Sequence, residues 1–400
     1  MDTTGGALVD QEHITHDTNR GQAMGELERI RKRPGMYVGS TGVRGLHEMV
    51  FTVAGQAVNE ALAGRARAVG VFLTPEGGVR VVVDRPGAPG DAAGDAEGPD
   101  LEALLTRMPS GTAPAGRRAA AVSLVGIGPE LLTANALSSR LTAEVRGGGV
   151  RQVLEYARGV AVTPRTTAGP AADSGTTIIF RPDAGVFDDT AACSFAALAE
   201  RFRELAFLNR SLDISLTDER PPGGSRSVRY LYPGGARDFV ALLDAGAGAP
   251  VHPDVIGFER EDPGMAGTVE VAMRWSSSPV NRILGFANSR PTPFYGGTHM
   301  EGFRRGSVAA INTYARQRGL LTAADPDLGA ERIEEGLTAV VSVKLDHPEY
   351  FGSTRGGLGN TEVLECVGRA VREHLGSWLE EHPEQAAAVL GRMLGQARTG

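Results

Sequence analysis

Residues 31–64 read RKRPGMYVGSTGVRGLHEMVFTVAGQAVNEALAG, and the part at 47–62 carries the clearest helical pattern in the chain. Apolar residues recur there at intervals of three and four, which is the spacing of one helix face: Val50, Val53, Ala54, Ala57, Val58 and Ala61. A polar stripe runs between them at one-turn intervals: Glu48, Thr52, Gln56 and Asn59. The segment therefore predicts an amphipathic helix with a continuous polar stripe.

The residues around this helix predict a sheet. Two β-rich runs, VGVFL (69–73) and VRVVVD (79–84), flank the turn TPEGG. Further strands are predicted at 141–146, 150–156, 175–181 and 214–220. Helices are predicted at 24–34, 100–108, 128–140 and 195–210.

A change in composition near residue 230 predicts a domain boundary. PPGGS (221–225) and PGG (233–235) lie on either side of it. Beyond it, helices are predicted at 235–245, 298–317 and 361–398, and strands at 267–275, 283–288 and 336–345. We therefore expect an N-terminal arm (1–23), a first domain (24–230) and a second domain (231–400).

Length and composition agree with two globular domains, because domains usually contain roughly 100–200 residues and this chain has 400. Cys193 and Cys366 are the only cysteines, which excludes a disulfide framework and a cysteine zinc site. A net charge of −7 argues against a dedicated nucleic-acid-binding protein. There is no apolar run long enough to span a membrane and no apolar N-terminal leader, so we expect a cytoplasmic protein without a membrane partner.

Five segments, in order along the chain, resemble the family of the DNA gyrase B and topoisomerase IV B proteins. They are RKRPGMYVGSTGVRGLHEMVFTVAGQAVNEALAG (31–64), RFRELAFLNRSLDISLTDER (201–220), YPGGARDFV (232–240), GGTHMEGFRRG (296–306) and EGLTAVVSVKLDHPEYFGSTRGGLGNTEV (335–363). The resemblance extends over about residues 24–398, which is nearly the whole chain.

The resemblance implies an α+β protein of two domains. The first is a GHKL-type ATPase fold, in which helices cover one face of a mixed sheet. The second is a transducer domain with an α/β fold similar to that of a ribosomal protein. The family's cleavage-associated metal-binding domain would begin where this sequence ends, so we expect no DNA-cutting machinery here.

The resemblance also implies a site in which water attacks the γ-phosphate of ATP, and several of its parts differ in this chain. The family's general base is a glutamate, and Thr52 stands at its position. Glu48, one turn earlier, is a weak candidate for a displaced base. The family's magnesium ligand is an asparagine, which is Gln56 here and a poor metal ligand by position, so we expect no metal site.

The adenine-binding part of the family's site is altered as well. The aspartate that accepts the adenine amino group is Val83 here, and Asp84 is expected on the other face of its strand. Gly87 and Pro89 match the turn that follows. The glycine-rich phosphate lid is reduced to LVGIGPE (124–130), whose glutamate opposes a phosphate.

The remaining parts of the family's site are closer to the pattern. Arg355 replaces the lysine that reaches the γ-phosphate from the second domain. Thr176 aligns with a threonine near adenine, and Arg146 aligns with an arginine at the pocket mouth. The arm at 1–23 has no tyrosine to reach over a partner's nucleotide. We expect ATP hydrolysis to be absent, with no cofactor.

Three functions remain open at this point. The first is a gyrase-B-like pseudoenzyme that binds a small molecule or gyrase without hydrolysing ATP. The second is an enzyme that uses the vacated nucleotide pocket for small-molecule, biosynthetic chemistry. The third is the Mg-ATP-dependent clamp of a divergent type II topoisomerase. The resemblance also implies a homodimer, gyrase subunits as partners, and a weak DNA contact through Arg304 and Arg305.

Overall fold

The computed structural model describes residues 25–84, 101–107, 130–188, 192–293, 296–351 and 356–395. These residues form two compact units. The first unit ends at Tyr230, and the second contains Leu231 onward together with Arg203–Ser211. The predictions for the arm at 1–23, for Gly87, Pro89 and Arg355, and for all but the last residue of the lid at 124–130 concern positions outside the described residues.

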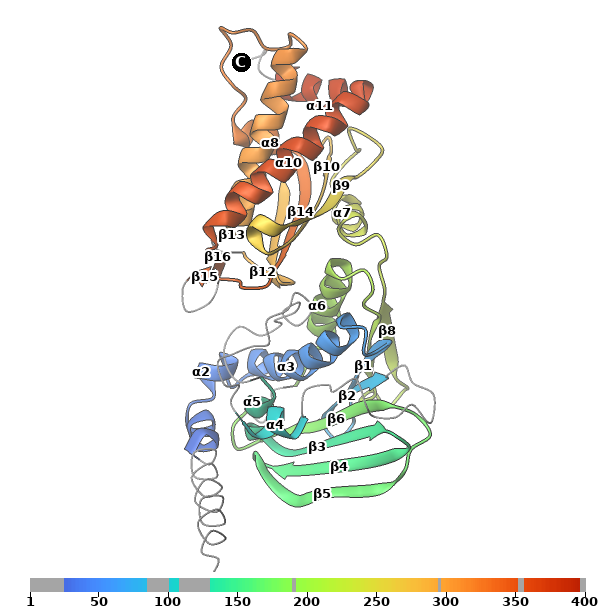
Figure 1. The fold of residues 1–400 in the computed structure, drawn as a ribbon. Coiled ribbons are helices and arrows are strands. Elements are labelled where there is room, and N and C mark those ends of the chain that lie inside the picture. Colours follow the sequence, from blue (N-terminus) through green and yellow to red (C-terminus); the bar gives the residue numbers. More distant parts are fainter. Residues whose placement is uncertain are drawn as a thin grey trace, which may run out of the picture. The chain divides into compact units, whose positions relative to one another are not determined.

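The first unit is built on an eight-stranded sheet with the order β5-β4-β3-β6-β2-β1-β7-β8 (Figure 1). The sheet is mixed, because β1 pairs parallel with β7 whereas the other neighbours pair antiparallel. The strands are β1 Ala68–Leu73, β2 Val79–Asp84, β3 Ser138–Gly147, β4 Val150–Ala157, β5 Val160–Pro170, β6 Gly175–Pro182, β7 Ile214–Asp218 and β8 Arg226–Tyr230.

Helices cover one face of this sheet (Figure 1). They are α2 Gly35–Val38, α3 Val43–Leu62, α4 Leu101–Thr106, α5 Glu130–Ala136 and α6 Phe195–Leu208, preceded by a helix at residues 25–32. The predicted apolar stripe of α3 is buried, with Val50, Val53 and Val58 fully inaccessible. Gly45 in its first turn is required by close packing, because a Cβ there would lie 1.9 Å from the carbonyl oxygen of Ser40.

The second unit contains a five-stranded sheet with the order β12-β11-β14-β10-β9 and a small three-stranded sheet, β13-β16-β15. The strands are β9 Ile256–Asp262, β10 Gly267–Trp275, β11 Arg282–Ala287, β12 Arg290–Pro291, β13 Gly296–Gly297, β14 Leu337–Leu345, β15 Tyr350–Phe351 and β16 Gly357–Leu358. The helices are α7 Ala236–Asp244, α8 Thr298–Gln317, α9 Ala330–Glu334, α10 Thr361–Glu381 and α11 Pro383–Gly395, with the short 3₁₀ turn Pro263–Met265.

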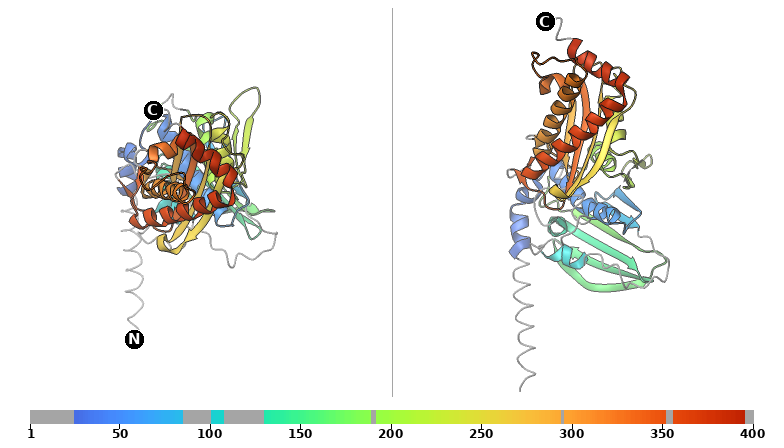
Figure 2. Two further views of the ribbon diagram at one scale, coloured as in Figure 1. Left: turned by 90° about the horizontal axis from the view of Figure 1, so that it is seen from above. Right: turned by 45° about the horizontal axis from the view of Figure 1, so that its top comes forward.

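Each face of the five-stranded sheet has its own core. On one face, α8 and α10 lie side by side across the strands (Figure 2), and their apolar residues pack with Val269, Val271 and Val341. On the other face, α7 packs together with the C-terminal end of α6 around Phe207. Successive side chains of β10 and β14 pack alternately into the two cores, which explains why both strands are apolar almost throughout.

The crossing of α8 and α10 provides a stability prediction. A Cβ at Gly302 would lie 2.5 Å from the carbonyl oxygen of Leu364, so Gly302→Ala must push the helices apart. We expect it to lower the free energy of unfolding by about 1–3 kcal/mol in chemical denaturation. Gly376→Ala in α10 is the matched control, because nothing lies within 4 Å of its added methyl. The control should raise stability by about 0.5–1 kcal/mol, and equal effects of the two substitutions would contradict the prediction.

The α+β class and the two-domain fold type predicted from the sequence are confirmed, while several local predictions were wrong. The helix predicted at 128–140 ends at Ala136, and Ser138 already begins β3. Strands β5, β8 and β9 were not predicted. They are edge strands in which few side chains are fully buried, so the hydrophobic signal is weak, and β5 includes prolines that only an edge tolerates. Among the described helices, none is both long and apolar enough to cross a membrane.

Candidate functional site

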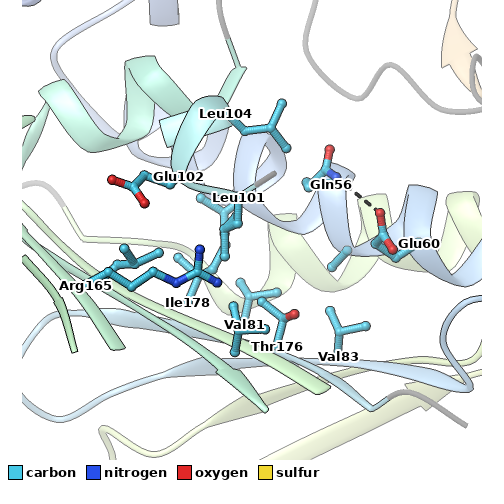
Figure 3. A pocket seen from close by; sticks show the side chains of 14 residues that line it. Gln56, Glu60, Val81, Val83, Leu101, Glu102, Leu104, Arg165, Thr176 and Ile178 are labelled. Carbon is cyan, nitrogen blue, oxygen red and sulfur yellow. Dashed lines mark hydrogen bonds between the residues drawn. The ribbon is translucent and has the colours of Figure 1, made fainter. Parts of the chain in front are cut away.

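A cavity of about 180 Å³ lies in the first unit between α3, α4 and the covered face of the sheet (Figure 3). Most of its wall is aliphatic. The lining residues are Val53, Gln56, Ala57 and Glu60 of α3, Val81 and Val83 of β2, Leu101, Glu102 and Leu104 of α4, Val145, Leu154 and Arg165 of β3 to β5, and Thr176 and Ile178 of β6.

Strand alternation decides which residues of β2 reach this cavity. Val81 and Val83 line it, and Val83 is only 4% exposed. Asp84, one residue further, is exposed and is not part of the lining, because successive side chains point to opposite faces. Thr176 stands directly beside Val83 across the antiparallel β2–β6 pair. At the expected adenine-contacting position the cavity therefore has an isopropyl group and no hydrogen-bond acceptor.

Thr52 lies one turn before Gln56 on α3 and is buried. Its hydroxyl donates a hydrogen bond of 2.8 Å to the carbonyl oxygen of Glu48 in the preceding turn. This is the common back-bond of a helical threonine. Neither Thr52 nor Glu48 is among the residues that line the cavity. A neutral threonine hydroxyl is too weak a base to take a proton from water.

Gln56 and Glu60 are the polar residues of α3 that line the cavity, and Glu60 also forms an ion pair with the partly exposed Arg65. The side-chain amide nitrogen of Gln56 lies 3.4 Å from Oε1 of Glu60. Glu60 is 6% exposed and accepts two hydrogen bonds from Arg65, at 2.8 and 3.0 Å. The hydrogen bond to Glu60 raises the pKa of Arg65 above its usual value. The carboxylate at this end of the cavity is therefore already neutralised by a protein cation.

Two exposed charged residues lie at the opposite rim, Glu102 on α4 and Arg165 on β5 (Figure 3). The Arg165 guanidinium donates a hydrogen bond to the side-chain oxygen of Gln152 on β4. Among the described lining residues, Arg165 is the only cation. The described wall of the cavity thus offers no buried positive charge.

Both Thr176 and Arg146 were expected at the pocket from the sequence, but only Thr176 lines the cavity. The Arg146 guanidinium lies on β3 within 3.1 Å of Glu144 and of Asp173, and it also donates to the hydroxyl of Thr177. These contacts engage the side chain within the sheet. A ligand in the cavity would meet Val145 at this point of β3 instead.

The two arginines considered for DNA lie on α8 of the second unit, and both are paired with acidic residues. Arg304 is 2.8 Å from Glu334 and 3.7 Å from Glu301. Arg305 is 2.7 Å from Glu301. Because each cation already has a carboxylate partner, this face of α8 has little free positive charge with which to hold a phosphate backbone.

Of the predicted site residues, the structure brings together Gln56, Val83 and Thr176 in one cavity. Sequence reasoning missed most of the aliphatic wall. Val81 and Ile178 could have been found, because each lies two residues along a strand from a predicted site residue. Arg165 and Leu101 could not have been found. Nothing in the sequence indicates that β5 or α4 lies close to the polar side of α3.

The described residues do not fit Mg-ATP. Gln56 can offer one neutral oxygen, and no cluster of three histidine, cysteine or acidic side chains that could hold a metal ion is found among the described residues. Val83 cannot accept a hydrogen bond from an adenine amino group.

Comparison with known proteins identifies relatives that align with more than nine-tenths of the chain. The family model for DNA gyrase B matches residues 235–400. The DNA gyrase B protein of Streptomyces coelicolor is 40% identical over 392 residues, which cover 94% of this chain and 57% of that protein. The novobiocin-sensitive DNA gyrase B protein of Streptomyces niveus is 40% identical over 393 residues, covering 93% of this chain and 57% of that protein.

Among solved structures, the 43K ATPase domain of Thermus thermophilus gyrase B, in complex with an aminocoumarin, superimposes with a TM-score of 0.76 at 31% identity. The match covers 93% of this chain and 95% of the Thermus chain. The chain spans about 57% of the length of the curated Streptomyces relatives. It therefore belongs to the DNA gyrase B family and is similar to the ATPase and transducer part of that family.

Proposed function

We propose that this chain is a gyrase-B-like binding protein that holds a small molecule in the α3–β2 cavity and does not hydrolyse ATP. The observation that carries the proposal is Thr52, which occupies the expected position of the general base. Its hydroxyl donates to the carbonyl oxygen of Glu48 at 2.8 Å, and it is buried. A positioned base contributes typically 10²- to 10⁴-fold to such a reaction.

Two further features of the cavity support loss of the nucleotide. Val83 replaces a hydrogen-bond acceptor with a buried apolar side chain. The Glu60 carboxylate is paired with Arg65, so it is not poised to activate water. Val83 affects the contact with adenine, whereas Thr52 and the paired Glu60 affect the activation of water.

Two kinds of measurement test this proposal. Calorimetry should detect no binding of a magnesium complex of a non-hydrolysable ATP analogue, and phosphate release from ATP should stay at the background rate. Novobiocin is the parallel probe, because one Streptomyces relative is named as sensitive to it and the Thermus relative binds an aminocoumarin. We expect novobiocin or a smaller aromatic molecule to bind where the analogue does not.

The Streptomyces coelicolor relative serves as the positive control in both assays. Thr52→Glu in this chain should not restore turnover, because Val83 and Gln56 remain unchanged. Micromolar binding of the ATP analogue, or turnover that disappears in a Gln56→Ala variant, would overturn the proposal and support an ATP-dependent clamp.

A further inference from the structure

We propose that the α3–β2 cavity selects an uncharged aromatic molecule of one or two rings that donates a hydrogen bond to the side-chain oxygen of Gln56. The inference rests on the proposed function, because it names the ligand class of the same cavity. It depends on three properties of the described wall: the orientation of one amide, the shape of the aliphatic floor and the placement of charge.

The orientation of the Gln56 amide follows from its neighbour. A carboxylate only accepts hydrogen bonds, so the side chain that lies 3.4 Å from Glu60 must turn its NH₂ group toward it. The amide oxygen of Gln56 then points away from Glu60 (Figure 3), and none of the described residues donates a hydrogen bond to it. The polar group that Gln56 presents to a ligand is therefore an acceptor.

Arg65 stabilises this orientation. It donates to both oxygens of Glu60, at 2.8 and 3.0 Å, and thereby fixes the carboxylate beside Gln56. If the Gln56 amide turned over, its carbonyl oxygen would face a buried carboxylate, and the NH₂ group would lose its acceptor. Through Glu60, which itself lines one end of the cavity, Arg65 thus fixes the hydrogen-bonding preference of Gln56.

The floor of the cavity suits a flat apolar ring. Val81, Val83 and Ile178 form adjacent aliphatic positions on β2 and β6. The cavity measures about 180 Å³. An apolar cavity of about 150 Å³ in another protein accepts benzene. One ring fits this space readily, and two fused rings fill it.

Charge placement excludes an anion from the inner cavity. Arg165 is the only cation among the described lining residues, and it is exposed at the rim with a hydrogen bond to Gln152. A carboxylate or phosphate pushed against Val83 would have to lose its water without gaining a cation. An uncharged ring with an N–H or O–H group avoids this cost and satisfies Gln56.

Paired fragments test the preference. Indole carries an N–H donor, whereas benzothiophene has the same shape with sulfur in its place. In ligand-observed NMR titrations we expect indole to bind the full chain about fivefold more tightly than benzothiophene, which is the effect of one hydrogen bond. Indole-2-carboxylate should bind more weakly than indole.

Two variants locate the effect. Gln56→Leu should bring the indole-to-benzothiophene ratio to about one, since it removes the acceptor and keeps the volume. Glu60→Gln should allow the Gln56 amide to turn over and present its NH₂ group to the cavity. The affinity for quinoline, which can only accept a hydrogen bond, should then rise relative to the affinity for indole. Gln317→Leu and Glu28→Gln are the matched controls, because both residues are exposed and lie outside the cavity lining. The controls should leave both ratios unchanged.

The outcomes separate this inference from the proposed function. If indole and benzothiophene bind equally and Gln56→Leu changes nothing, the donor preference is wrong while the binding protein stands. If no fragment binds the wild-type chain, or if indole-2-carboxylate binds best, the ligand class is wrong. Tight binding of the Mg-ATP analogue would instead overturn the proposed function itself.

Discussion

Replacing Phe207 by alanine should lower the free energy of unfolding of the second unit by about 3–5 kcal/mol, the usual cost of removing a buried phenyl ring. Phe207 lies near the end of α6 and is 2% exposed. Its ring stacks on Tyr232 at a centroid distance of 3.7 Å and on Phe239 of α7 at 4.7 Å. The substitution leaves a cavity between these two aromatic residues and the β10–β14 face of the sheet, which cannot close without moving α7.

Tryptophan fluorescence can follow this unit separately. The chain has two tryptophans, Trp275 and Trp378, and both belong to the second unit. Denaturant titrations of Phe207→Ala should therefore shift the fluorescence midpoint to lower concentration. Phe195→Ala is the matched control, since Phe195 begins the same helix in the first unit and is only partly buried. An equal shift in the two variants would contradict the assignment of Phe207 to the second core.

This helix also shows where sequence reasoning stops. The pattern at 195–210 predicted α6 correctly and indicated a buried face, but it could not indicate which neighbour covers that face. The sequence placed the whole helix in the first domain, whereas the structure assigns Arg203–Ser211 to the second unit. The periodicity of apolar residues indicates which face of a helix is buried. It is the same whichever sheet covers that face.

Elements with a strong periodic signal were predicted almost to the residue. The helix expected at 298–317 has the bounds of α8, and the strand expected at 79–84 has those of β2. The edge strands β5, β8 and β9 were missed because only one neighbour pairs with each of them and few of their side chains are fully buried. Whether such a segment forms a strand depends more on its position in the sheet, which is a tertiary property, than on its composition.

The candidate site was predictable in the same uneven way. Val83 and Thr176 could both be assigned to the site from the sequence, because the resemblance aligns each of them with a family residue near adenine. The contact between Gln56 and Glu60 could also be anticipated, since residues four apart lie on the same side of a helix. The role of Arg65 could not, because it lies beyond the end of α3 and returns to Glu60 only through the turn after the helix.

His299, at the start of α8, should make the second unit strongly sensitive to acid. The ring is fully buried, its Nε2 atom lies 3.2 Å from the Thr292 hydroxyl, and its Nδ1 atom has no hydrogen-bond partner among the described residues. Burial lowers the pKa of His299 from 6.5 to about 3. The imidazole therefore stays neutral in the folded state at pH values where it is protonated in the unfolded chain.

The sign of the effect follows from proton counts. Between pH 6.5 and about 3 the unfolded chain binds a proton at His299 that the folded chain does not, so stability falls as the pH falls. The slope approaches about 1.4 kcal/mol per pH unit, which gives a loss of about 3 kcal/mol between pH 7 and pH 4.

Urea titrations followed by tryptophan fluorescence can isolate this term by comparing the wild-type chain with His299→Gln. The variant keeps a polar group near Thr292 but cannot be protonated, so it should lose about 3 kcal/mol less than the wild type between pH 7 and pH 4. Carboxylates whose pKa values are lowered, such as Asp262 beside Arg369, also destabilise the fold in acid. They do so equally in both proteins and cancel in the difference. If the two stability curves run parallel over this range, His299 is not the buried neutral base that its surroundings require.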